Sequence, residues 1–112
     1  MQLLKEMMGA GLSVQVKKEF RNKRGDVFPV GATVMCEFRD TSVRIVLGDA
    51  AVILSYPIAS KLLTKFKPAP STNTLAKMTY GSVATTPLGS RTEPDGRGIY
   101  GEPSWLIAMG LI

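Results

Sequence analysis

The fold is decided by residues 32–54, ATVMCEFRDTSVRIVLGDAAVIL. Apolar and polar side chains alternate along this stretch, and in an extended chain such alternation places every second residue on the same face. The alternating apolar residues are Ala32, Val34, Cys36 and Phe38, then Val43, Ile45 and Leu47, then Val52, Leu54 and Tyr56. Gly48-Asp49 is typical of a hairpin turn. The pattern predicts three antiparallel strands, and the last ends at Pro57 because proline cannot donate to a strand ladder.

Shorter segments extend this pattern in both directions. Ser13 to Phe20 predicts an edge strand, followed by a polar turn at Arg21 to Asp26. On the other side, Pro57 to Ser60 suits one turn of 3₁₀-helix, before a last apolar segment that ends at Phe66. Several short strands joined by tight turns predict a small all-β barrel, since a short chain must close or cover its sheet edges.

Two motifs resemble the SH3-like small barrels. Arg24 to Glu37 (RGDVFPVGATVMCE), with its Phe28 to Gly31 turn, resembles the diverging turn of these barrels. The hairpin Val43 to Tyr56, followed by Pro57 to Ser60, is similar to their late strands and 3₁₀ turn. The resemblance covers residues 13–66 and implies an SH3-like barrel, which bacterial and phage-encoded proteins share. No KOW signature and no aromatic PxxP-binding groove is present, so no ligand residue is carried over.

The composition divides the chain of 112 residues into two parts of one small domain. Gly, Pro, Ser and Thr make up 14 of the first 66 residues and 21 of the last 46. We expect a barrel over residues 1–66, with a short N-terminal helix at its start, and a Gly/Pro-rich arm over residues 67–112. Within the arm, Leu75 to Ala84 is compatible with a short strand, and Glu102 to Ile112 predicts a helical turn beginning at Pro103.

The residue counts exclude several kinds of chemistry. The chain has no histidine and one cysteine, Cys36, which excludes a Ser-His-Asp or Cys-His triad, a Cys/His zinc site and a disulfide within the chain. No spacing pairs two of the nine carboxylates as acid and base. Gly96 to Gly101 reads G-x-G-x-x-G, but no βαβ unit surrounds it, so it indicates a flexible loop. We therefore expect a non-enzymatic protein without a cofactor or a metal.

A cluster of positive charge is the strongest functional signal. Lys plus Arg number 14 against 9 acidic residues, for a net charge of +5. Five of these cations fall within eight positions, namely Lys17, Lys18, Arg21, Lys23 and Arg24. On a hairpin they would neutralise phosphates of a nucleic-acid backbone, with Asn22 adding a hydrogen bond and Phe20 and Phe28 as stacking groups. The alternative reading is a solvated turn whose lysines protect an edge strand.

A second hypothesis assigns binding to the C-terminal arm. Trp105, Leu106 and Met109 share one face of the predicted turn and would contact a protein partner or another copy of the chain. The ending resembles the Pro-Ser-Trp-Leu endings of small phage proteins, which implies a phage or mobile-element inhibitor, assembly protein or virion protein. We expect a location in the cytoplasm, or in a host's cytoplasm, and no membrane partner. The cytoplasmic expectation rests on the single cysteine and on Met1 to Gly11, where charged residues interrupt the apolar run that a signal peptide needs. The longest uncharged apolar stretch, Ala50 to Ser60, contains a proline and is too short to span a bilayer, so we expect no membrane partner.

Overall fold

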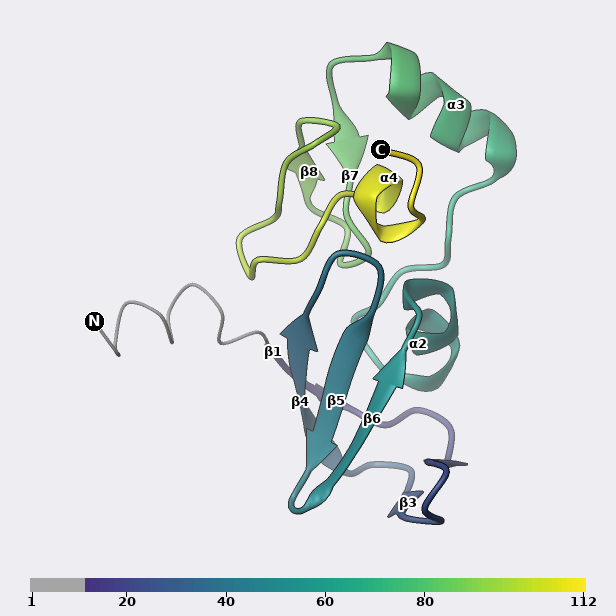
Figure 1. The fold of residues 1–112 in the computed structure, drawn as a ribbon, viewed down its shortest axis with the longest axis vertical. Coiled ribbons are helices and arrows are strands. Elements are labelled where there is room, and N and C mark those ends of the chain that lie inside the picture. The colour runs from purple at the N-terminus through teal and green to yellow at the C-terminus, as the bar shows by residue number, and fades with distance from the viewer. Residues whose placement is uncertain (1–11) are drawn as a thin grey trace, which may run out of the picture.

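The computed structural model describes residues 12–112 (Figure 1). The first half contains β1 (Leu12–Gln15), β2 (Phe20–Arg21), β3 (Val27–Phe28), β4 (Thr33–Phe38), β5 (Val43–Leu47), β6 (Ala50–Leu54) and helix α2 (Tyr56–Leu62). The second half contains α3 (Thr72–Tyr80), β7 (Ala84–Thr85), β8 (Arg91–Thr92) and α4 (Trp105–Ala108). The short N-terminal helix that the sequence predicts lies outside the described residues.

A four-stranded antiparallel sheet carries the first half, in the order β1-β4-β5-β6. The alternating pattern sets its register, which pairs Cys36 with Ile45 and Val43 with Leu54. Val34, Cys36, Val43 and Ile45 are all buried on one face. The predicted strands at residues 32–38 and 43–47 and the Gly48-Asp49 hairpin are confirmed, whereas the third strand ends at Leu54, two residues before the predicted Tyr56.

The expected all-β SH3-like barrel is wrong. Residues 12–112 form a mixed fold, in which eight strands make three small sheets and three helices accompany them, and none of these sheets closes into a barrel. After β6 the chain enters α2 instead of continuing as a strand, so β6 does not reach β1. The free edge of β1 is covered by residues after α2, through a bridge between Val16 and Leu63 and a 2.9 Å bond from the Thr64 N–H to the Gln15 carbonyl.

Helices occupy two positions where the sequence predicted other structure. Pro57 to Ser60 belongs to the seven-residue helix α2. Its first turn tolerates Pro57 because the N–H that proline lacks would have no partner within the helix there. The short strand suggested within Leu75 to Ala84 is wrong for most of its length, because α3 occupies residues 72–80. The Ser71 hydroxyl caps α3 by accepting from the Thr74 N–H, and Leu75 and Met78, three residues apart, bury the same face.

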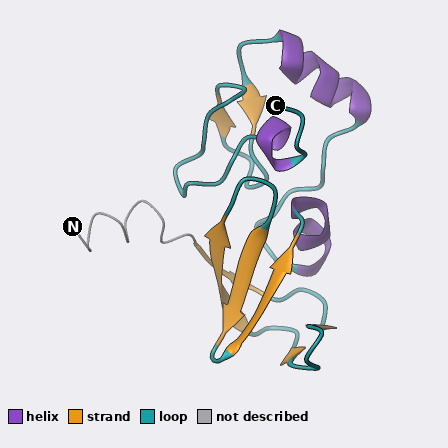
Figure 2. Cartoon of the chain, viewed as in Figure 1, coloured by secondary structure: helices purple, strands orange, loops and turns teal. Residues whose placement is uncertain are grey.

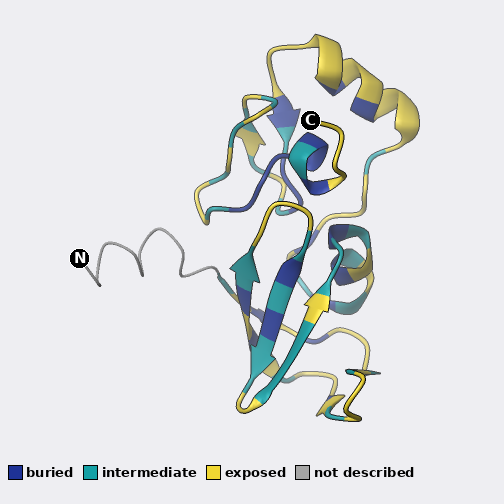
Figure 3. Ribbon diagram, viewed as in Figure 1, coloured by how far each residue is buried: buried dark blue, intermediate teal, exposed yellow. Residues whose placement is uncertain are grey.

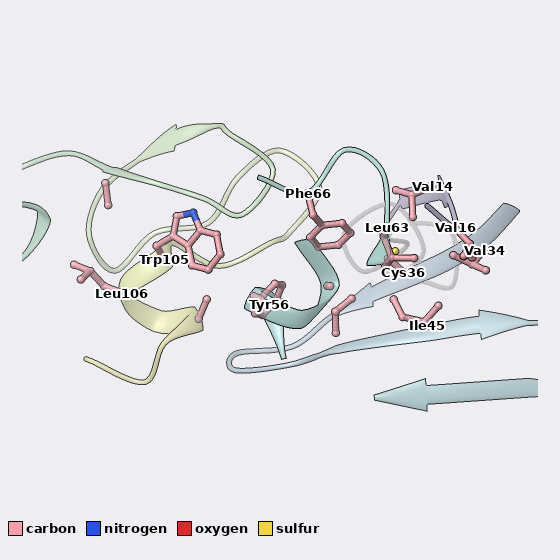
Figure 4. Close-up of a cluster of buried hydrophobic side chains, with 14 of the residues drawn as sticks. Val14, Val16, Val34, Cys36, Ile45, Tyr56, Leu63, Phe66, Trp105 and Leu106 are labelled. Carbon is pink, nitrogen blue, oxygen red and sulfur yellow. The ribbon is translucent and has the colours of Figure 1, made fainter. Parts of the chain in front are cut away.

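The C-terminal residues fold against the sheet region. The predicted helical turn is confirmed as α4, although Ser104 is its N-cap and Pro103 precedes it. In this half α4 packs beside the short β7–β8 hairpin, and α3 packs against α4 (Figure 2). One continuous core joins the halves, and buried segments occur in both (Figure 3). Within the core, Tyr56 and Phe66 lie between the sheet and Trp105 (Figure 4). The rings of Tyr56 and Phe66 lie 6.5 Å apart, centre to centre.

Candidate nucleic-acid interface

The five predicted cations are all exposed, and the structure divides them into two groups. Lys17 and Lys18 lie between β1 and β2, while Lys23 and Arg24 form the turn between β2 and β3. Arg21 lies in β2, between the two groups in the chain. Each group borders a hollow that residues from other elements complete.

The first hollow, here called the turn hollow, lies where the β2–β3 turn meets the sheet. It has a volume of about 430 Å³. Its lining consists of three cations, one amide and a stretch of the edge strand, namely Lys23, Arg24, Arg44, Asn22, Ala51, Val52 and Ile53. Arg44 comes from β5 and pairs across the ladder with Ile53 of β6. The fold therefore adds a third cation to two that are neighbours in sequence.

Asn22 fixes the β2–β3 turn to the edge of the sheet. Its amide group donates to Asp26 Oδ2 at 2.9 Å and to the Ala51 carbonyl at 3.0 Å. Its Oδ1 accepts from the Asp26 N–H at 2.9 Å. The amide of Asn22, which the sequence indicates for a hydrogen bond to a nucleic acid, is therefore already bonded within the chain. Asn22 positions the turn and covers part of the free edge of β6.

The charges around the turn hollow are only partly neutralised. Arg44 Nη1 lies 3.1 Å from Glu37 Oε2 on the neighbouring strand, which orients the guanidinium. Arg24 Nε lies 3.9 Å from Asp26 Oδ2, at the outer limit of an ion pair. Lys18, Arg21 and Lys23 form no ion pair with any of residues 12–112. Exposed pairs such as these add little stability, so their cations can exchange partners at small cost.

The second hollow, here called the helix hollow, lies between the end of β1 and α2. Its volume is about 680 Å³, and it is lined by Lys17, Lys18, Pro57, Ser60, Lys61, Pro68 and Ala69. The Lys17 ammonium donates to the Ser60 carbonyl at 2.9 Å, in the last turn of α2, where carbonyls lack partners within the helix. The N–H of Lys17 also donates to the Leu62 carbonyl, at 2.7 Å. Lys17 therefore has a structural role as well as a charge.

The predicted stacking residues are not free to receive bases. The rings of Phe20 and Phe28 stack on one another, with centres 4.7 Å apart and planes 4° from parallel. Phe28 has no exposed surface, and Phe20 packs against the core. Both rings therefore anchor the β2–β3 hairpin.

The predicted partner-binding residues lie in different surroundings. Trp105 and Leu106 belong to the chain's own core, at 1% and 0% exposed, and present no surface to a partner in this conformation. Met109 is 38% exposed. With Leu111 and residues of α3 it lines an apolar groove of about 410 Å³.

The Cys36 thiol and the glycine loop 96–101, the two other features that could have carried chemistry, have structural roles. Burial raises the pKa of the Cys36 thiol to about 12, so the thiol is protonated and shielded in the folded chain. The glycine loop 96–101 wraps around the buried carboxylate of Glu102, which accepts from the Tyr100 N–H at 3.0 Å and from the Thr86 hydroxyl at 2.8 Å. The loop thus holds a carboxylate of its own chain where a nucleotide loop would hold a phosphate.

Arg44 and Lys61 are the cations that the sequence did not single out. Arg44 occupies the outward position of an alternating strand, between buried Val43 and Ile45, so its exposure was readable. Its approach to the β2–β3 turn depends on the Asn22 bond to Ala51, which no local pattern shows. The place of Lys61 beside the helix hollow could not be predicted, because the helical turn expected from the sequence ends at Ser60 whereas α2 continues to Leu62.

Within residues 12–112, no group of three His, Cys, Asp or Glu side chains is placed to hold a metal ion. None of the helices in this part of the chain is long and apolar enough to cross a membrane. Comparison with protein-family models, with curated proteins and with solved structures gives no match for this chain.

Proposed function

We propose that this chain is a non-enzymatic binding module that contacts the backbone of a nucleic acid in the cytoplasm. Its contact surface is the basic face, which we define as Lys17, Lys18, Arg21, Lys23, Arg24, Arg44 and Lys61. The observation that carries the proposal is that cations from the β1–β2 segment, the β2–β3 turn, β5 and α2 gather around two hollows. Acidic side chains engage only Arg24 and Arg44 of this set within residues 12–112.

The chemistry of these cations suits phosphate. Arginine presents parallel N–H groups that match two phosphate oxygens, and lysine supplies a mobile point charge. Neutralising several phosphates releases condensed counterions, which drives binding at low salt. The strands of the β2–β3 hairpin have two residues each, so they are too short to read base edges in a groove. We therefore expect binding that depends on charge and is tolerant of sequence.

A pair of charge variants tests this proposal. The first changes Lys18, Arg21, Lys23 and Arg24 to Gln and leaves Lys17, which bonds to α2, in place. The matched control changes four exposed cations outside both hollows to Gln, namely Lys65, Lys67, Lys77 and Arg91. Both variants lose four charges, so a difference between them reports the position of the charge and not its total.

Binding to labelled DNA and RNA is measured by fluorescence anisotropy over a salt series. We expect the parent and the control to bind with a steep salt slope. The first variant should bind at least about tenfold more weakly, with a slope reduced by about 0.7 per lost contact on a single strand or 0.9 on a duplex. Equal weakening of both variants, or no binding by the parent at low salt, would contradict the proposal.

A second candidate function is binding of a protein through the C-terminal region. The apolar groove between α3 and residues 109–111 favours it, as does the exposure of Tyr80 and Ile112, which are 90% and 60% exposed. This function predicts an affinity with little salt dependence and a complex of defined mass by light scattering. Substitution of Leu111 by Ser would weaken that complex and leave nucleic-acid binding unchanged.

A further inference from the structure

The turn hollow combines positive charge with an apolar wall. Lys23, Arg24 and Arg44 bring the charge, while β6 contributes Ala51, Val52 and Ile53. Ile53 is 56% exposed, although β-branched apolar side chains in strands are usually covered. Contact with a phosphate backbone would account for the cations, but it would not account for the exposed isoleucine.

The two kinds of surface lie side by side. Arg44 and Ile53 are directly paired across β5 and β6, so their side chains are neighbours on the outer face of the sheet. Glu37 orients Arg44, and the bonds of Asn22 hold the turn that carries Lys23 and Arg24. A phosphate held by Arg44 would place the attached sugar or base within reach of Ile53.

Resting on the proposed function, we propose that the turn hollow takes one unpaired nucleotide, and that the preferred ligand is a single strand. The phosphate would lie against the cations, and the sugar and base would cover Ile53. In a duplex the base is stacked and paired, so it cannot turn toward the protein without paying the cost of unstacking. The volume of about 430 Å³ is within the range of small-ligand sites.

The test uses three labelled DNA ligands with matched numbers of phosphates: a thymidine strand, an abasic strand and a duplex. Their affinities are measured for the parent, for Ile53→Ser and for Ile58→Ser. Ile58 lies on α2 away from the turn hollow and is 48% exposed, so it is a matched control. Circular dichroism checks that each variant is folded, which the exposure of both side chains favours.

We expect the thymidine strand to bind roughly threefold to tenfold more tightly than the abasic strand and the duplex. Ile53→Ser should remove most of that advantage and leave the salt slope unchanged, whereas Ile58→Ser should keep it. The inference would be overturned, while the proposed function stood, if the parent bound all three ligands with equal affinity. It would also be overturned if Ile53→Ser and Ile58→Ser kept the same advantage for the thymidine strand. Absence of binding to every ligand would overturn both.

Discussion

The sheet region, residues 12–66, and the C-terminal region, residues 67–112, are stabilised by different means. In the sheet region four strands bond along a regular ladder, and the buried side chains are apolar apart from the Tyr56 hydroxyl, which donates to the Arg39 carbonyl. In the C-terminal region the two strands have two residues each. All three buried polar residues of the described chain, Thr86, Glu102 and Ser104, lie in this region. A ladder distributes stability over many similar bonds, whereas a polar network depends on each member.

The two regions therefore differ in their tolerance of single substitutions. In the sheet region one side chain can change while the register survives, because the alternating pattern is repeated on three strands. In the C-terminal region Glu102 bonds to Thr86 and to the 96–101 loop, and Ser104 bonds to Pro94 and to Ile107 of α4. Removing one such group leaves its partners, which are buried or partly buried, without that bond. The shared core around Trp105 couples the two regions.

The largest effect is expected at that coupling. Trp105→Ala should lower the free energy of unfolding by about 3–5 kcal/mol, because it removes the largest fully buried side chain. Urea unfolding followed by circular dichroism measures this loss. The matched control is Ile45→Ala, within the sheet, which should lower the free energy of unfolding by about 2–5 kcal/mol.

Hydrogen exchange on the same two variants shows whether the two regions unfold together. If the core is one cooperative unit, either substitution lowers the protection of amides in β4 and β5 as well as in α3 and α4. Loss of protection confined to residues 67–112 in Trp105→Ala would show instead that the regions unfold separately.

The polar network gives the next effect. A Cβ on Gly98 would overlap the carboxyl group of Glu102, so Gly98→Ala should cost about 1–3 kcal/mol. Glu102→Ala should cost a similar amount, because the Thr86 hydroxyl and the Tyr100 N–H would lose their acceptor.

The double variant decides whether overlap is the cause. With the carboxyl group gone, Gly98→Ala should cost at least about 1 kcal/mol less than it does in the parent, by denaturant unfolding of all four proteins. Additive costs would mean that Gly98 is required for a different reason.

The sheet region was largely predictable from sequence, and the closure of the sheet was not. Alternation from Ala32 to Leu54 reports which face of each strand is buried, and it places β4, β5 and the hairpin correctly. It does not report whether the chain after Leu54 continues as a strand, and α2 is what leaves the sheet open. In the C-terminal region Ser71 and Leu75 carried a readable helix signal, a cap followed by an apolar face, which the frequent Pro and Gly residues obscured.

The candidate site was predictable only in part, for a similar reason. A run of charge within eight residues is visible in the sequence, and its five members are exposed. Four of the five border two separate hollows, which Arg44 and Lys61 complete, and this arrangement depends on long-range contacts such as the bond from Asn22 to Ala51. Sequence gives the sign of the charge, and tertiary structure decides which cations act together.

A pH effect on stability is expected from the apolar core of the sheet. Burial raises the pKa of Cys36 from 9.0 to about 12, so the folded state retains this proton more strongly than the unfolded state. The resulting stabilisation is complete below about pH 9 and is lost as the pH rises toward 12, by up to about 1.4 kcal/mol per pH unit. Burial also raises the pKa of Tyr56, which adds to the alkaline loss.

Urea unfolding at pH 8 and pH 10.5 measures this effect in the parent and in Cys36→Ala. The variant should be less stable at pH 8, because it leaves a small cavity, but it should lose less stability between the two pH values. In the folded parent at pH 8, a thiol reagent should react on the order of a thousandfold more slowly than in urea. Equal alkaline losses in the two proteins would contradict the assignment to Cys36.

The smallest effect is expected at the junction between the two regions. Lys65 has a φ of 72°, a left-handed conformation that costs a residue with a Cβ about 1–2 kcal/mol. Glycine adopts this conformation freely but loses more entropy on folding, so Lys65→Gly should raise the free energy of unfolding by up to about 1 kcal/mol. Lys77→Gly, in the exposed face of α3, removes the same side chain from a helix and should lower it by about the same amount. Opposite signs in denaturant unfolding would show that the junction stores backbone strain, whereas a loss in both variants would mean that the Lys65 side chain stabilises the junction.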